Sequence, residues 1–176
     1  MSHPEPAAVL LSGRGSNLEA LLAQAESEGW KDALVLVGSN VPEAPGLAIA
    51  AAYGVPTFSL DHRSYGPARR TDFDAELARR LIDANVRWVV LAGFMRVLGP
   101  SFLRSFPGRV LNIHPSLLPA FPGLHTHRRA LAAGVDRHGC TVHLVDDSLD
   151  GGPILAQAAV PVLPGDDEDS LAARVL

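Results

Sequence analysis

The chain has 176 residues and a formal net charge of −4 at pH 7, with 47% hydrophobic and 19% charged residues. This length suits one domain that buries its own core, and the composition is that of a globular protein. The negative charge argues against a general nucleic-acid binder, because such proteins neutralise phosphates with a basic face. It still allows a local pocket for a single phosphate.

Residues 7–100 alternate short β-rich runs with helical patterns, which is typical of a parallel α/β sheet. We predict strands over 7–12, 33–39, 57–60 and 88–92 and helices over 16–28, 47–53, 69–85 and 101–105. The strand 88–92 is continuously apolar, as expected for a central strand covered on both faces. The helix 69–85 is expected to have one apolar side, formed by Phe73, Leu77, Leu81 and Ile82.

The second half has a different pattern. A strand over 110–113 precedes a loop, 115–123, that holds three prolines and must be structured, and a helix is predicted over 126–133. Strands over 140–145 and 154–162 follow, joined by a short acidic loop that favours antiparallel pairing. The fold class is therefore α/β: a Rossmann-like, mostly parallel twisted sheet with helices on both faces, mixed with an antiparallel strand in the C-terminal half.

Nothing in the sequence indicates export or a membrane. Cys140 is the single cysteine, so no intramolecular disulfide can form, which fits a reducing compartment. Residues 1–6 lack the features of a signal peptide, and no apolar run approaches membrane-spanning length. We expect a cytoplasmic protein with no membrane or nucleic-acid partner.

A glycine loop follows the first strand and opens a helix. Its residues Gly13 and Gly15 let backbone N–H groups approach an anion, and Ser16 or Asn17 is expected to cap the helix. A dinucleotide site is disfavoured because Leu18 replaces the third glycine of that motif and no carboxylate ends the second strand. A single phosphate is the better ligand, and a turn that binds nothing is the alternative.

Two polar side chains lie at the end of the predicted strand 110–113. Asn112 and His114 are two residues apart, so they share a face, at the strand end where open α/β sheets bind ligands. An amide and an imidazole together can stabilise an oxyanion and move a proton. The acidic loop holds Asp146, Asp147 and Asp150, and its Gly-Gly pair could turn one of these carboxylates inward, where it would favour the imidazolium form of His114. Solvated turn-forming aspartates are the alternative.

Other catalytic chemistries have weaker support. Five of the seven histidines lie between 114 and 143, yet no cysteine pair or His-Glu-x-x-His helix accompanies them, so no metal is expected. No serine nucleophile elbow is present, and Cys140 is interpreted as a small core residue rather than a nucleophile.

The residues resemble those of the glycinamide ribonucleotide formyltransferases of purine synthesis, from about Val9 to the last residue. Four separated motifs occur in the right order, at 12–18, 91–96, 111–127 and 149–153. The resemblance implies transfer of a formyl group from the co-substrate 10-formyltetrahydrofolate to the amine of glycinamide ribonucleotide, without a metal. It implies one catalytic domain over 1–176, with a phosphate-binding half at 7–100 and a folate-binding and catalytic half at 101–176, and leaves a homodimer open.

The resemblance also implies roles for individual residues. Gly15, Ser16 and Asn17 match the loop that holds the substrate phosphate, and Asn112, His114 and Asp150 match the catalytic trio. The residues that match folate contacts are Arg70, Met95, Arg96, Val97, Leu98, Asn112, Asp146, Asp147, Ser148, Leu149 and Asp150. The family often has threonine where Asp146 stands. The peptide bond between Leu118 and Pro119 is expected to be cis.

Three alternatives remain. A formyltetrahydrofolate hydrolase shares the Asn-x-His and aspartate chemistry, but a phosphate loop would serve no purpose in it. A methionyl-tRNA formyltransferase would need basic surface for tRNA. A non-catalytic nucleotide- or folate-binding module would make the Asn112, His114 and Asp150 set accidental. The predicted helix from Ser170 is short at Leu176, and the resemblance implies a truncated form that lacks a glutamate binding the substrate's glycinamide end.

Overall fold

The computed structural model describes residues 4–176, which form two compact units that meet in sequence between Val110 and Leu111. The boundary lies ten residues beyond the boundary between the two predicted halves, and the roles of those halves stay predictions. Within residues 4–176, no helix is both long enough and apolar enough to cross a membrane.

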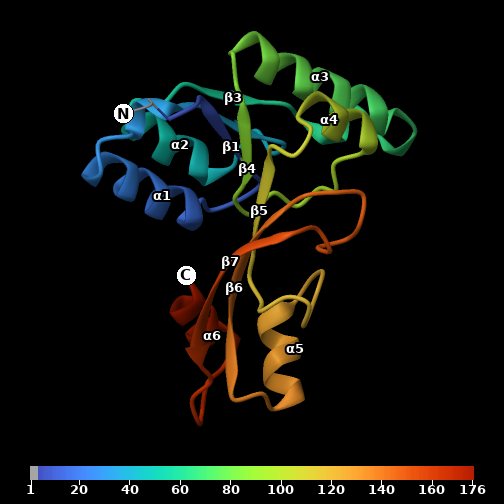
Figure 1. The fold of residues 1–176 in the computed structure, drawn as a ribbon. Helices are drawn as coiled ribbons and strands as arrows, with labels where there is room; N and C mark the ends of the chain where they lie inside the picture. Colours follow the sequence, from blue (N-terminus) through green and yellow to red (C-terminus); the bar gives the residue numbers. More distant parts are fainter. Residues whose placement is uncertain (1–3) are drawn as a thin grey trace. The chain divides into compact units, whose positions relative to one another are not determined.

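The first unit contains a parallel sheet in the strand order β3-β2-β1-β4 (Figure 1). The strands are β1 (Ala7–Leu11), β2 (Leu34–Ser39), β3 (Thr57–Ser59) and β4 (Trp88–Leu91). The side chains of β1 from Ala8 to Leu11 are fully buried, because helices cover both faces of this strand. This arrangement confirms the α/β class and the parallel pairing of the first half.

Helices cover both sides of this sheet, with α1 next to α2 and α3 next to α4 (Figure 1). Their bounds are α1 (Ser16–Ser27), α2 (Pro45–Ala52), α3 (Arg70–Asp83) and α4 (Pro100–Ser105). Three short 3-10 turns, at Lys31–Ala33, His62–Ser64 and Pro67–Arg69, complete the connections. All four predicted helices of this half are therefore present, each shifted by a few residues at most.

Three expectations for this unit are wrong in detail. Ile82 is 52% exposed, since nine residues at about 100° per residue place it opposite Phe73 on the helix. The strand β4 is not covered evenly, because Val89 and Leu91 are buried while Trp88 and Val90 are half-buried. The N-cap of α1 is Gly15, with no side-chain cap, so neither Ser16 nor Asn17 caps the helix.

The second unit is built on the antiparallel strands β5 (Val110–His114), β6 (Arg137–Leu144) and β7 (Ile154–Pro161). The helix α5 (Thr126–Ala133) has the predicted bounds, and α6 (Glu168–Val175) packs against β6 and β7 (Figure 1). Asp167 and Ser170 form a capping box at the start of α6. Antiparallel pairing of the last two strands and the cis bond before Pro119 are both confirmed. Cys140 lies within β6 and is half-buried, so it is not a fully buried core residue.

Candidate active site

The glycine loop of the first unit is held against the start of α2. Gly15 has a left-handed backbone, with φ of 83°, and a Cβ added there would lie 2.6 Å from the Cα of Gly46. The N–H of Gly46 donates to the carbonyl of Gly13 at 3.1 Å. Glycine is therefore required at position 15 for two separate reasons, the backbone conformation and the close approach of a second backbone.

This loop borders a cavity of about 190 Å³. The volume equals roughly six water molecules at about 30 Å³ each, enough for a phosphate group. The start of α1 adds unpaired backbone N–H groups and the positive end of the helix dipole. The cavity is lined by Ser12, Gly13, Arg14, Gly15, Ser16, Asn17, Ala92, Gly93 and Met95. The structure thus brings Gly15, Ser16 and Asn17 together around one space, with Ser12 as an additional member.

The segment after β4 is held through its backbone. The N–H of Met95 donates to the Ser12 hydroxyl at 2.7 Å, and that hydroxyl donates to the Asn40 side chain at 2.5 Å. The guanidinium of Arg70, at the start of α3, donates to the carbonyl of Val97. Met95 and Val97 are exposed, whereas Leu98 is buried. The predicted folate contacts at Arg70 and 95–98 therefore lie together in the first unit.

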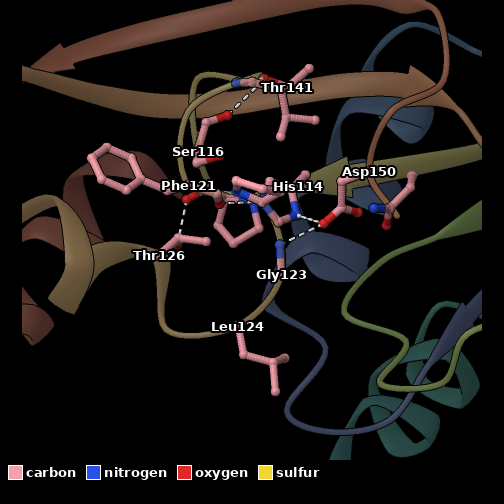
Figure 2. A network of polar contacts seen from close by, with 12 residues as sticks. His114, Ser116, Phe121, Gly123, Leu124, Thr126, Thr141 and Asp150 are labelled. Atoms are coloured by element: carbon pink, nitrogen blue, oxygen red, sulfur yellow. Dashed lines mark hydrogen bonds and ion pairs between the residues drawn. The ribbon is translucent and has the colours of Figure 1, made fainter. Parts of the chain in front are cut away.

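In the second unit, the buried His114 pairs with the half-buried Asp150. The Asp150 Oδ2 lies 3.4 Å from His114 Nδ1 and accepts the Gly123 N–H at 2.8 Å (Figure 2). The His114 Nε2 lies 3.1 Å from the carbonyl oxygen of Phe121. Both ring nitrogens therefore face acceptors, and a doubly protonated ring can donate to both.

The loop conformation explains why Asp150 faces inward. Asp150 has a positive φ of 51°, which aspartate adopts more readily than most residues. A Cβ on Gly152 would lie 1.9 Å from the Leu144 carbonyl oxygen, so only glycine allows the loop to return this closely to β6. The expectation that the Gly-Gly pair directs a carboxylate inward is thus confirmed for Asp150.

Asn112 belongs to this cluster through a residue that sequence reasoning did not select. Its Nδ2 lies 3.1 Å from the Nε2 of His143, the residue directly opposite it in the β5–β6 register. That same Nε2 lies 3.8 Å from Asp150 Oδ1, and the Nδ1 of His143 bonds to the Leu144 carbonyl. When His143 donates its Nδ1 proton to that carbonyl, its Nε2 accepts the hydrogen bond from the Asn112 amide. This bond fixes the orientation of the Asn112 amide. The signal that identifies His143 is the antiparallel pairing of β5 with β6, and it can be used only once the register of the two strands is known.

The remaining acidic-loop residues point outward. The positions 146–149 are all exposed, and Asp146 accepts the backbone N–H of Ser148 at 2.9 Å and also its hydroxyl. These bonds from Ser148 lower the pKa of Asp146 below its ordinary value. Asp146 therefore has the local turn-forming role that was the alternative for these aspartates.

Two other histidines lie in the same unit. His138 is 1% exposed, and its Nε2 lies 3.2 Å from the Nδ1 of His127. Burial lowers the pKa of both rings. Within residues 4–176, no group of three or more His, Cys, Asp or Glu side chains is placed to hold a metal ion.

Comparisons with known proteins show the family of this chain. A family model described as formyl transferase matches residues 6–176. The trifunctional purine biosynthetic protein adenosine-3 of Drosophila melanogaster is 51% identical over 96% of this chain, which spans only 12% of that protein. The phosphoribosylglycinamide formyltransferase of Escherichia coli is 47% identical over 95% of this chain and 78% of its own length.

Comparison with solved structures finds relatives of the same kind. A crystal structure of glycinamide ribonucleotide transformylase 1 from Symbiobacterium toebii superposes with a TM-score of 0.92 at 46% identity, covering 99% of this chain and 82% of that one. The sequence match and the structural match thus extend over both units of the chain. The chain therefore belongs to the formyl transferase family.

Proposed function

We propose that this chain transfers the formyl group of 10-formyltetrahydrofolate to the amine of glycinamide ribonucleotide, a step of purine biosynthesis. The observation that carries the proposal is the pair of the buried His114 and Asp150, with Asn112 held in the same cluster by His143. The names of the relatives, phosphoribosylglycinamide formyltransferase among them, point to the same reaction. Both substrates are small molecules, and we place the reaction in the cytoplasm.

The reaction is acyl transfer between two nitrogens. The amine nitrogen attacks the formyl carbon, a new C–N bond forms, and the bond from the formyl carbon to N10 of the folate breaks. The proton that leaves the amine ends on N10, through water. Negative charge develops on the formyl oxygen during the attack, so a preorganised donor and a nearby positive charge lower the barrier.

The residues of the cluster fit these tasks. Asn112 has two amide N–H groups, and His143 occupies one of them, which leaves the second for the formyl oxygen. A protonated His114 would supply positive charge, with its two nitrogens against the Asp150 carboxylate and the Phe121 carbonyl. Asp150 holds the ring in place. No step is routed through a metal ion.

The first unit supplies the binding groups in this proposal. Gly15, Ser16 and Asn17 hold the phosphate of glycinamide ribonucleotide through backbone N–H groups at the start of α1. The backbone of Met95, Arg96, Val97 and Leu98 binds the pterin, with Arg70 beside it. In the second unit, the exposed loop of Asp146, Asp147, Ser148 and Leu149 closes over the folate.

A spectrophotometric assay with 10-formyl-5,8-dideazafolate tests the proposal. Deformylation that depends on glycinamide ribonucleotide, with formylated amine as the product, is the expected result. Deformylation at the same rate without the amine would identify a hydrolase. No deformylation, with or without the amine, would identify a binding module, and either outcome would reject the transferase.

A further inference from the structure

The helix α3 contains a buried carboxylate that the proposed mechanism does not use. Asp74 is 2% exposed and lies one turn after Arg70. Its Oδ2 accepts the N–H of Gly99 at 2.8 Å, and its Oδ1 has no hydrogen-bond partner in the part of the chain that the structure describes. A carboxylate in such surroundings is costly, so its presence calls for a reason.

The surroundings of Asp74 partly offset this cost. Burial raises the pKa of the Asp74 carboxyl, while the Gly99 N–H and then the charges of Arg70 and Arg96 act in the opposite direction. The guanidinium of Arg96 also lies over the Phe73 ring, 4.5 Å from its centroid. The charges of Arg70, on α3, and of Arg96, within the segment 95–98, therefore both act on the same carboxylate.

Arg70 and Asp74 hold the segment 95–99 at two points. Four residues apart on α3, they lie on the same side of the helix. Arg70 donates to the carbonyl of Val97, and Asp74 accepts the N–H of Gly99 two residues later. A Cβ on Gly99 would lie 2.7 Å from Asp74 Oδ2, so the close approach requires glycine there.

We propose that Asp74 is a positioning residue for folate binding. Together with Arg70, it holds the backbone of residues 95–98 in the position that binds the pterin. This inference rests on the proposed function, which assigns the pterin to that segment. The alternative is that Asp74 only anchors α4, whose N-cap is Gly99. A purely structural anchor would affect stability without separating the two substrates.

The test compares Asp74→Ala and Asp74→Asn with Asp83→Asn as a matched control. Asp83 is exposed on the same helix and, among residues 4–176, pairs only with Arg79, so its variant should behave as wild type. Asp74→Ala should raise the KM for 10-formyl-5,8-dideazafolate about tenfold, as expected for loss of a hydrogen bond to a charged group. Asp74→Asn keeps an acceptor for the Gly99 N–H and should raise this KM less. The KM for glycinamide ribonucleotide should stay unchanged in both variants.

Calorimetric titration of 5,8-dideazafolate into each variant gives a readout independent of turnover, and the same order of weakening is expected. Equal rises in both KM values, or a lower Tm with unchanged folate affinity, would overturn the inference. If Asp74→Ala does not fold, Asp74→Asn decides by the same criteria. A wild-type chain that neither binds the folate nor transfers formyl would instead reject the proposed function, so the two failures are distinguishable.

Discussion

The glycine loop and the His114 cluster, the two sites of the proposed function, are built from different parts of the chain. The loop is built from backbone, it borders an open cavity, and its Gly15 tolerates no Cβ. The cluster is built from side chains, and His114 and His143 are 5% and 2% exposed. A backbone site should be sensitive to added atoms and tolerant of side-chain changes, whereas a side-chain site should be sensitive to every deletion.

The largest effect is expected from deletions in the cluster. Asn112→Ala, His114→Ala and Asp150→Ala should each lower kcat about a hundredfold or more, the usual cost of removing oxyanion stabilisation. Circular dichroism should show that each variant remains folded. Near wild-type kcat in either Asn112→Ala or His114→Ala would remove the basis for assigning the chemistry to this cluster.

A smaller loss of activity should follow when a methyl group is added in the glycine loop. Gly15→Ala places a Cβ 2.6 Å from the Gly46 backbone at a φ of 83°, so it should lower stability and raise the KM for glycinamide ribonucleotide. Gly29→Ala is the matched control, since Gly29 follows the same helix with a φ of 77° and nothing within 4 Å of the added Cβ.

Gly29→Ala should lower the free energy of unfolding by about 1–2 kcal/mol, through backbone strain alone. Its KM for the amine substrate should equal that of the wild type. Equal KM values for Gly15→Ala and Gly29→Ala would mean that the loop does not bind the substrate.

A third variant separates orientation from chemistry inside the cluster. His143→Ala leaves the Asn112 amide without its partner and should lower kcat about tenfold, since one hydrogen bond of roughly 1 kcal/mol or more is lost. His143→Gln places a polar atom near the former Nε2 and should recover part of that loss. Unchanged kcat in His143→Ala would show that Asn112 needs no support from β6.

The smallest effect concerns stability and pH. Burial lowers the folded pKa of His127 and His138, while an unfolded histidine titrates near 6.5. The contribution of these rings to the free energy of unfolding is therefore fully present above pH 6.5. It decreases as the pH falls through 6.5 towards the pKa values of the folded state, by at most about 1.4 kcal/mol per pH unit for each proton. Glu168 acts on His127 in the opposite sense, and the charges of His127 and His114 add to the effect on His138.

Thermal unfolding between pH 7.5 and 5 measures this dependence. His138→Asn should flatten the decrease in Tm, and the exposed His125→Asn should leave it as in the wild type. A wild-type Tm that rises on acidification over this range would contradict the assignment.

Local sequence patterns predicted most elements but not the contacts between distant segments. The helix α5 was predicted residue for residue, because Gly134 follows it in the left-handed conformation that ends helices. The cap of α1 was misassigned, since the choice of Gly15 depends on Gly46, thirty-one residues later. His143 was missed for the same reason: its position opposite Asn112 depends on the register of two strands, which no local pattern encodes.

The most direct test of the division between loop and cluster crosses enzyme variants with removal of the substrate phosphate. We expect Gly15→Ala to lower kcat/KM about tenfold more for glycinamide ribonucleotide than for the dephosphorylated ribonucleoside, the cost of one lost hydrogen bond to a charged group. His114→Ala should lower kcat/KM equally for both substrates. An equal loss with Gly15→Ala on both substrates would show that the loop does not bind the phosphate and would contradict the account.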